Sequence, residues 1–117
     1  MTYPCPCCGY LVFAQPPGSS EICPICCWED DVSQLRFPAA AGGANRPSLV
    51  AAQVNFAKIG ASEAQFLDRV RKAQANDRRD ADWRPINPAH DLACTPLGQA
   101  LGYPTDRTQL YYWRAKS

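Results

Sequence analysis

Two short stretches decide the fold of this chain: Cys5-Pro6-Cys7-Cys8-Gly9 and Cys23-Pro24-Ile25-Cys26-Cys27. Each contains a Cys-Pro-x-Cys motif, in which the proline pre-sets φ for a turn and both cysteines can face one ion. Fourteen residues, 9–22, separate the two motifs. This is close to zinc-ribbon spacing and suits one hairpin between two knuckles. The pattern therefore predicts one structural zinc ion held by four thiolates, from Cys5, Cys8, Cys23 and Cys26.

The same cysteines leave alternatives open. Two disulfides, or a redox Cys-x-x-Cys motif, would also use such pairs, although the repeated motif with proline in the same place favours a metal. Each motif also has an adjacent third cysteine, Cys7 or Cys27. An adjacent side chain points away from the shared ion, so we interpret these two as small buried or half-buried groups. Alternate ligation and redox sensing are the functional alternatives.

Length and composition are those of one small globular domain, residues 1–117. Hydrophobic residues make up 46% and charged residues 20%, while eleven prolines and seven glycines predict short elements and much irregular structure. A small, loop-rich chain of this kind needs an additional stabilising link, such as a structural zinc ion. Seven cysteines and the lack of a signal peptide before Cys5 lead us to expect a reducing cytoplasm. No apolar stretch is long enough to span a membrane.

The first 31 residues predict a zinc-ribbon-like hairpin. Residues 10–13 are strand formers that should leave the first knuckle, residues 16–20 form the turn, and Glu21-Ile22 returns to the second knuckle. Trp28 is expected to pack over the zinc site or the hairpin.

A short helical hairpin is predicted over residues 47–75. Ser48 is a good N-cap and Gly60 a good stop for the first helix. Ser62-Glu63-Ala64-Gln65 resembles the capping box of a second helix, 62–75, which would dock through Phe66 and Val70.

The last part, residues 76–117, is predicted to be an irregular C-terminal extension. It contains a polar charge run and two prolines before residue 90, and it ends in the strand-like, aromatic stretch 110–113, which could add an edge strand. The predicted fold class is thus small α+β, with the knuckle hairpin packed on the helical hairpin.

Charge is spread unevenly along the chain. Residues 1–45 hold four acidic residues and one basic residue, and residues 46–117 hold eleven basic and seven acidic residues, although the total is only +1. A nucleic-acid-binding zinc ribbon is therefore the alternative function, with phosphate contacts from Arg69, Arg71, Lys72, Arg78 and Arg79. Interleaved acids at 68, 77, 80 and 82 dilute this potential and make nucleic acid the less favoured partner.

Several motifs, taken in order, resemble the bacterial cysteine-rich CPCC family, from about Tyr3 to the second predicted helix. They are Cys5-Pro6-Cys7-Cys8-Gly9-Tyr10, Pro16-Pro17-Gly18-Ser19, Glu21-Ile22-Cys23-Pro24-Ile25-Cys26, Trp28-Glu29-Asp30-Asp31 and Gly42-Gly43-Ala44-Asn45. The resemblance implies a small cytoplasmic bacterial protein. Because members accompany secreted polymorphic toxins, it also implies an immunity protein that binds and occludes a cognate toxin.

We expect such a protein to be a non-enzymatic interaction module. Its predicted partner-binding residues are the acids Glu29, Asp30 and Asp31 and the aromatic residues Tyr111, Tyr112 and Trp113. The alternative is that the acids are solvated and the aromatic residues belong to the core. His90 and Cys94 are weak candidates for a nucleophilic pair, since nearby prolines leave little room for a helix, and His90 is a weak candidate zinc ligand.

Overall fold

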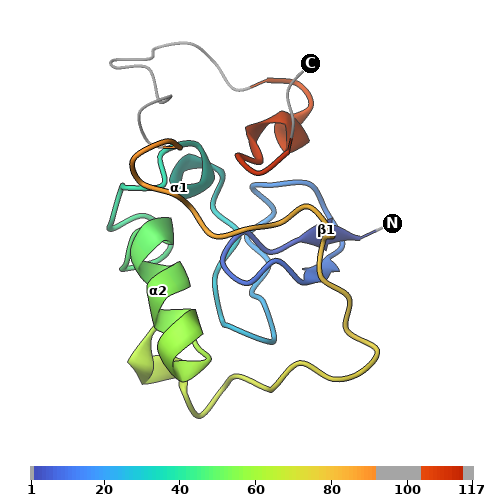
Figure 1. The fold of residues 1–117 in the computed structure, drawn as a ribbon, viewed down its shortest axis with the longest axis vertical. Helices are drawn as coiled ribbons and strands as arrows, with labels where there is room; N and C mark the ends of the chain where they lie inside the picture. Colours follow the sequence, from blue (N-terminus) through green and yellow to red (C-terminus); the bar gives the residue numbers. More distant parts are fainter. Residues whose placement is uncertain (1, 92–103, 115–117) are drawn as a thin grey trace.

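The computed structural model describes residues 2–91 and 104–114 (Figure 1). It is a small α+β structure, as predicted. Its elements are the strands β1 (Tyr3–Pro4) and β2 (Leu11–Phe13), the helices α1 (Val32–Arg36) and α2 (Leu49–Ile59), and the 3-10 turns η1 (Ala64–Phe66) and η2 (Arg107–Leu110). No helix in these residues is long and apolar enough to cross a membrane.

The strands flank a knuckle instead of joining the two knuckles. β1 pairs antiparallel with β2, on the two sides of the first knuckle. An isolated bridge between Ile22 and Glu29 spans the second knuckle in the same way. The predicted pairing of residues 10–13 with Glu21-Ile22 is therefore wrong. The reason is that each knuckle is itself a tight turn that returns the chain antiparallel to its entry.

The two knuckles share one backbone pattern. In the first, Gly9 N donates to Cys5 O at 2.7 Å and Cys5 N donates to Tyr10 O at 2.9 Å. In the second, Cys27 N donates to Cys23 O at 2.8 Å and Cys23 N donates to Trp28 O at 2.9 Å. Gly9 (φ 82°) and Cys27 (φ 67°) both close their turns in the left-handed region, which glycine adopts at little cost and cysteine does not.

Helix α1 is absent from the sequence-based prediction, although Asp31 three residues before Gln34 is an N-cap signal. The carboxylate of Asp31 accepts from Ser33 N at 2.8 Å and Gln34 N at 3.2 Å, and its other oxygen accepts from Ala44 N at 2.8 Å. Burial favours the neutral acid, but these hydrogen bonds outweigh it and lower the pKa of Asp31. One carboxylate thus caps a helix and anchors the glycine-rich loop.

We expect Asp31→Ala to lower the free energy of unfolding by about 1–2 kcal/mol, because it removes a helix cap and an anchor of the loop. Asp31→Asn should have an intermediate stability: its amide oxygen can still accept both helix N–H groups, but its amide nitrogen cannot accept from Ala44 N. Urea titrations of the metal-loaded proteins at neutral pH check this. An Asn variant as unstable as the Ala variant would contradict the capping role.

Two buried amides hold the loop of residues 37–47 against the second knuckle. Gln34 is buried, and its Nε2 donates to the carbonyls of Ala40, Asn45 and Pro47 at 3.0–3.2 Å. Asn45 donates to Glu29 O and accepts from Glu29 N, both at 2.8 Å. This pair of bonds imitates a strand neighbour, so the loop completes the sheet-like edge beside the knuckle.

Helix α2 confirms the prediction for residues 49–59. Ser48 Oγ accepts from Ala51 N at 3.1 Å, and Gly60 (φ 80°) ends the helix. Leu49 and Ala52 are buried in the core. Gln53, which follows Ala52, is also buried, and its side-chain amide forms hydrogen bonds.

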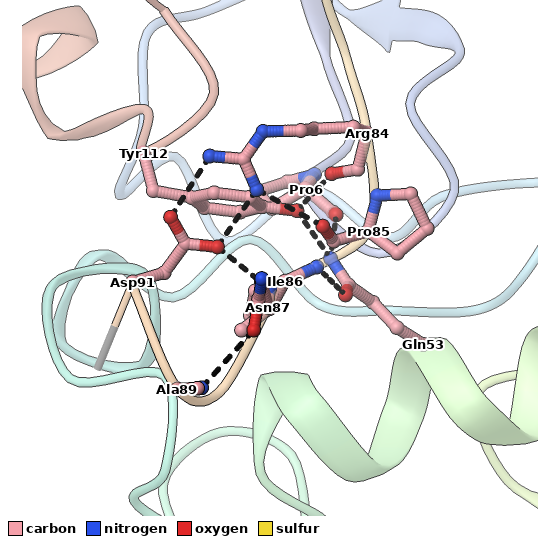
Figure 2. Close-up of polar contacts among 9 residues, drawn as sticks. All are labelled: Pro6, Gln53, Arg84, Pro85, Ile86, Asn87, Ala89, Asp91 and Tyr112. Carbon is pink, nitrogen blue, oxygen red and sulfur yellow. Dashed lines mark hydrogen bonds and ion pairs between the residues drawn. The ribbon is translucent and has the colours of Figure 1, made fainter. Parts of the chain in front are cut away.

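Gln53 joins four parts of the chain (Figure 2). Its Nε2 donates to Pro6 O at 2.9 Å and to the hydroxyl of Tyr112 at 2.8 Å, while its Oε1 accepts from Ile86 N at 2.8 Å. The hydroxyl of Tyr112 in turn donates to Arg84 O. One side chain therefore ties helix α2 to the first knuckle and to two separate places in the C-terminal extension, at Ile86 and Tyr112.

The predicted second helix, 62–75, is wrong. Only the 3-10 turn η1 is assigned as a helix there, and residues 71–74 have no regular secondary structure. Phe66 and Val70 are half-buried and do not dock a helix. The backbone is committed to the second knuckle instead: Ser62 N donates to Cys26 O at 2.8 Å and Arg71 N to Pro24 O at 3.1 Å. These two bonds hold the chain along the knuckle and override its local helical preference.

The C-terminal extension crosses the molecule from the side of β1 to that of α1 and α2, drawn yellow to orange in Figure 1. The described end of the chain forms η2 and a turn, so the predicted edge strand over 110–113 is wrong. Tyr111 and Trp113 are 1% and 6% exposed and stack at 4.6 Å between ring centroids. They belong to the core, which was the alternative interpretation of the aromatic stretch.

Candidate metal centre

Four sulfur atoms converge where the knuckles meet. The Sγ atoms of Cys5 and Cys26 are 3.6 Å apart and those of Cys8 and Cys23 are 3.7 Å apart, and all four lie within 4.8 Å of one another. A tetrahedral ion with metal–sulfur bonds near 2.3 Å requires sulfur–sulfur distances of roughly 3.8 Å. None of these cysteines is in a disulfide. The four predicted ligands are thus placed to bind one metal ion.

The site is buried and its backbone favours negatively charged sulfur. All four cysteines are 0% exposed. In the second knuckle, the backbone N–H groups of Ile25 and Cys26 donate to Cys23 Sγ at 3.4 and 3.5 Å, and Trp28 N donates to Cys26 Sγ at 3.4 Å. Such donors stabilise thiolates and orient them toward a shared ion.

Burial acts on the protonation of the clustered thiols. Burial raises the pKa of the Cys5 and Cys26 thiols well above the ordinary value for cysteine. Hydrogen bonds, the largest effect coming from Cys26, lower the pKa of the Cys23 thiol. A metal ion must displace the protons of Cys5 and Cys26, so its binding is coupled to proton release.

The remaining cysteines and the histidine stay outside this cluster. Cys7 is fully buried, and burial raises the pKa of its thiol, so it packs as a small neutral group. Cys27 is half-buried and occupies the left-handed position of the second turn. His90 lies in a turn of the extension and is not part of the four-sulfur group found among the described residues. Cys94 lies outside the described residues.

The C-terminal extension covers the first knuckle. Leu11 N donates to Arg78 O and Asp80 N donates to Gly9 O, both at 2.8 Å, so Arg79 forms an isolated antiparallel bridge with Tyr10 beside the turn. The indole of Trp83 donates to Pro6 O at 3.0 Å and lies against Gly9, where a Cβ atom would come within 2.6 Å of the ring. Only glycine can stand at that position under this ring.

The sequence analysis did not predict these contacts with the first knuckle. Gln53, Arg79 and Trp83 all donate to carbonyls of the first knuckle, and each lies more than forty residues further along the chain. The sequence carries no local signal for such pairings, because the acceptors are backbone oxygens that every residue possesses.

The predicted acidic contact residues are in three different environments. Glu29 is half-buried and its backbone pairs with Asn45. Asp30 is 3% exposed, accepts from Ser19 N and Ser19 Oγ, and has its pKa raised by burial. Asp31 caps α1. The carboxylates of Asp30 and Asp31 therefore stabilise the fold through hydrogen bonds to neighbouring residues. Among the described contacts of the three acids, only the Glu29 side chain makes no such hydrogen bond.

Three of the five predicted phosphate-binding cations contact other groups of the protein. Arg71 is paired with Asp77 at 2.7 Å. Arg69 lies over the ring of Phe66, and Arg79 packs on the first knuckle. The other two, Lys72 and Arg78, are exposed.

The fold and the four-sulfur site define a small, cysteine-rich protein with a metal-binding cluster between two knuckles. The model of the cysteine-rich CPCC family matches residues 3–77, which is more than half of the chain, and the protein belongs to that family. The match contains both knuckles, α1, α2 and η1 and ends just before the covering segment. No curated protein matches the chain.

Proposed function

We propose that this protein is a non-enzymatic interaction module stapled by one zinc ion, and that its task is to bind and occlude a cognate toxin as an immunity protein. The proposal of a structural zinc ion rests on the four converging cysteines, each of which is 0% exposed. Four protein thiolates complete a tetrahedral shell, whereas a catalytic zinc keeps one position open for water or substrate.

Zinc is the metal that we propose because it suits four thiolates in a tetrahedral arrangement and needs no redox partner. Unpaired thiols at every described cysteine suit a reducing compartment, and we propose a cytoplasmic location for that reason. A structural ion fixes the surrounding loops, and fixed loops lose less entropy when a partner binds.

The immunity role is the expectation that the resemblance to the cysteine-rich CPCC family implies. Occlusion requires a rigid surface and no reactive group. The cysteine cluster, the buried amides Gln34 and Asn45, and the network around Gln53 supply that rigidity.

Co-expression with the product of an adjacent toxin gene tests this function. We expect growth to be restored, a stable complex on size-exclusion chromatography, and an unchanged toxin mass by mass spectrometry, since occlusion makes no covalent change. Failure of the pure proteins to associate, or a chemically altered toxin, would overturn the proposal.

A further inference from the structure

Arg79 is held between two aromatic rings above the first knuckle. Its guanidinium carbon lies 4.6 Å from the ring centroid of Tyr10 and 5.0 Å from that of Trp83. Its Nε donates to Cys8 O at 2.8 Å. Trp83 is fixed in turn by its indole bond to Pro6 O. The guanidinium is therefore oriented by the metal-binding knuckle itself.

Arg79 differs from the three arginines that pair with a carboxylate. Arg71, Arg84 and Arg114 each pair with a carboxylate, at 2.7, 2.7 and 3.3 Å. In the described part of the chain, no carboxylate pairs with Arg79 and no acceptor takes a hydrogen bond from its two Nη groups, although the residue is exposed. A guanidinium with two donors left for a ligand presents a planar fork that matches a carboxylate.

We propose that Tyr10, Arg79 and Trp83 form a docking surface for a protein partner that presents an Asp or Glu side chain, whose carboxylate binds the Nη fork of Arg79. Arg, Tyr and Trp are the side chains that dominate binding energy at protein interfaces. The rings and the Nε bond fix the fork before the partner arrives, so little entropy is lost on binding. The surface deepens the proposed function, on which it rests, by naming the contact and its chemistry.

The surrounding charges favour a protein carboxylate over nucleic acid. Asp82 is exposed three residues after Arg79, and Asp80 lies between them. A polyanion needs several neighbouring cations to release its counterions. One oriented fork with acids beside it suits a single carboxylate, flanked by apolar groups that contact Tyr10 and Trp83.

Side-chain NMR of the zinc-loaded protein tests the surface with defined probes. The first probe is the capped peptide Gly-Leu-Glu-Leu-Gly, and the second is the same peptide with Gln in place of Glu. Inorganic phosphate and an oligothymidine complete the set. We expect the acidic peptide to shift the Nε–H signal of Arg79 and the indole signal of Trp83, with a Kd about tenfold lower than that of the neutral peptide.

Arg78→Gln is the matched control, since Arg78 is the exposed neighbour and makes no ring contact among the described residues. Arg79→Gln should raise the Kd of the acidic peptide about tenfold, and Arg79→Lys should raise it nearly as much, because Lys keeps the charge but not the fork. Arg78→Gln should change it by less than about twofold. Metal content and the backbone spectrum show that each variant is folded.

Equal losses in the Arg78 and Arg79 variants, an unmoved Arg79 signal, or tighter binding of oligothymidine than of the acidic peptide would each overturn the docking surface. The toxin complex separates this failure from that of the function. If Arg79→Gln leaves the toxin complex intact, the docking surface is wrong and the proposed function stands. If the wild-type protein forms no complex, the proposed function is wrong, and the peptide titration then tests the docking surface by itself.

Discussion

Cys8→Ser should abolish metal binding and unfold most of the protein. The variant removes one of four thiolates from a site that is wholly buried and that joins the two knuckles. In small metal domains the free energy of metal binding is largely free energy of folding. We expect the metal content to fall from one ion per chain to about none, and the dispersion of the backbone NMR spectrum to collapse. Elemental analysis and a backbone spectrum measure both effects.

Cys27→Ser is the control for this experiment. Cys27 follows the ligand Cys26 directly but is half-buried and outside the cluster. The variant should keep its metal and its spectrum, and a strong chelator should unfold it as readily as the wild type. Full metal occupancy in Cys8→Ser, or loss of metal from Cys27→Ser alone, would mean that the ligands are misassigned.

Gln53→Leu should lower the free energy of unfolding by about 3 kcal/mol. The substitution keeps the volume but leaves the buried Ile86 N without its acceptor (Figure 2). It also removes one of the two hydrogen bonds of Pro6 O, which keeps the bond from Trp83, and one of the two of the Tyr112 hydroxyl, which keeps its bond to Arg84 O. Each buried polar group left unpaired costs about 1–3 kcal/mol. Denaturant titration of the zinc-loaded protein measures the loss, and hydrogen exchange at Ile86 should accelerate.

The matched control is Gln65→Leu, because Gln65 is exposed and its side chain bonds only to Glu63 among the described residues. It should change stability by less than about 0.5 kcal/mol. If Gln53→Leu cost no more than this control, the C-terminal extension would not be fastened to the first knuckle through Gln53.

Local features of the sequence predicted the metal ligands and helix α2. Cys5 and Cys8, like Cys23 and Cys26, are brought together by a single turn, so their spacing alone reports their geometry. Ser48 and Gly60 act on their own helix, so the ends of α2 could also be predicted.

Predictions failed where backbone groups found distant partners. Residues 62–75 have helical spacing, but Ser62 N and Arg71 N bond to carbonyls of the second knuckle. The stretch 110–113 looks like a strand, but Trp113 is drawn into the core, where its indole donates to Asp80 at 3.0 Å. Neither partner can be recognised from residues near it in the chain. Tertiary contacts of this kind routinely override local propensity.

The position of Trp83 over Gly9 has a consequence for the order of assembly. The four ligands lie between residues 5 and 26, whereas Trp83 follows more than fifty residues later. During synthesis the amino-terminal part emerges first, and closing a loop of fourteen residues costs little entropy. The nascent chain can therefore capture its ion while the Gly9 turn is still open to solvent. An ion bound at that stage would be covered later, when the indole of Trp83 reaches Gly9 and Pro6 O.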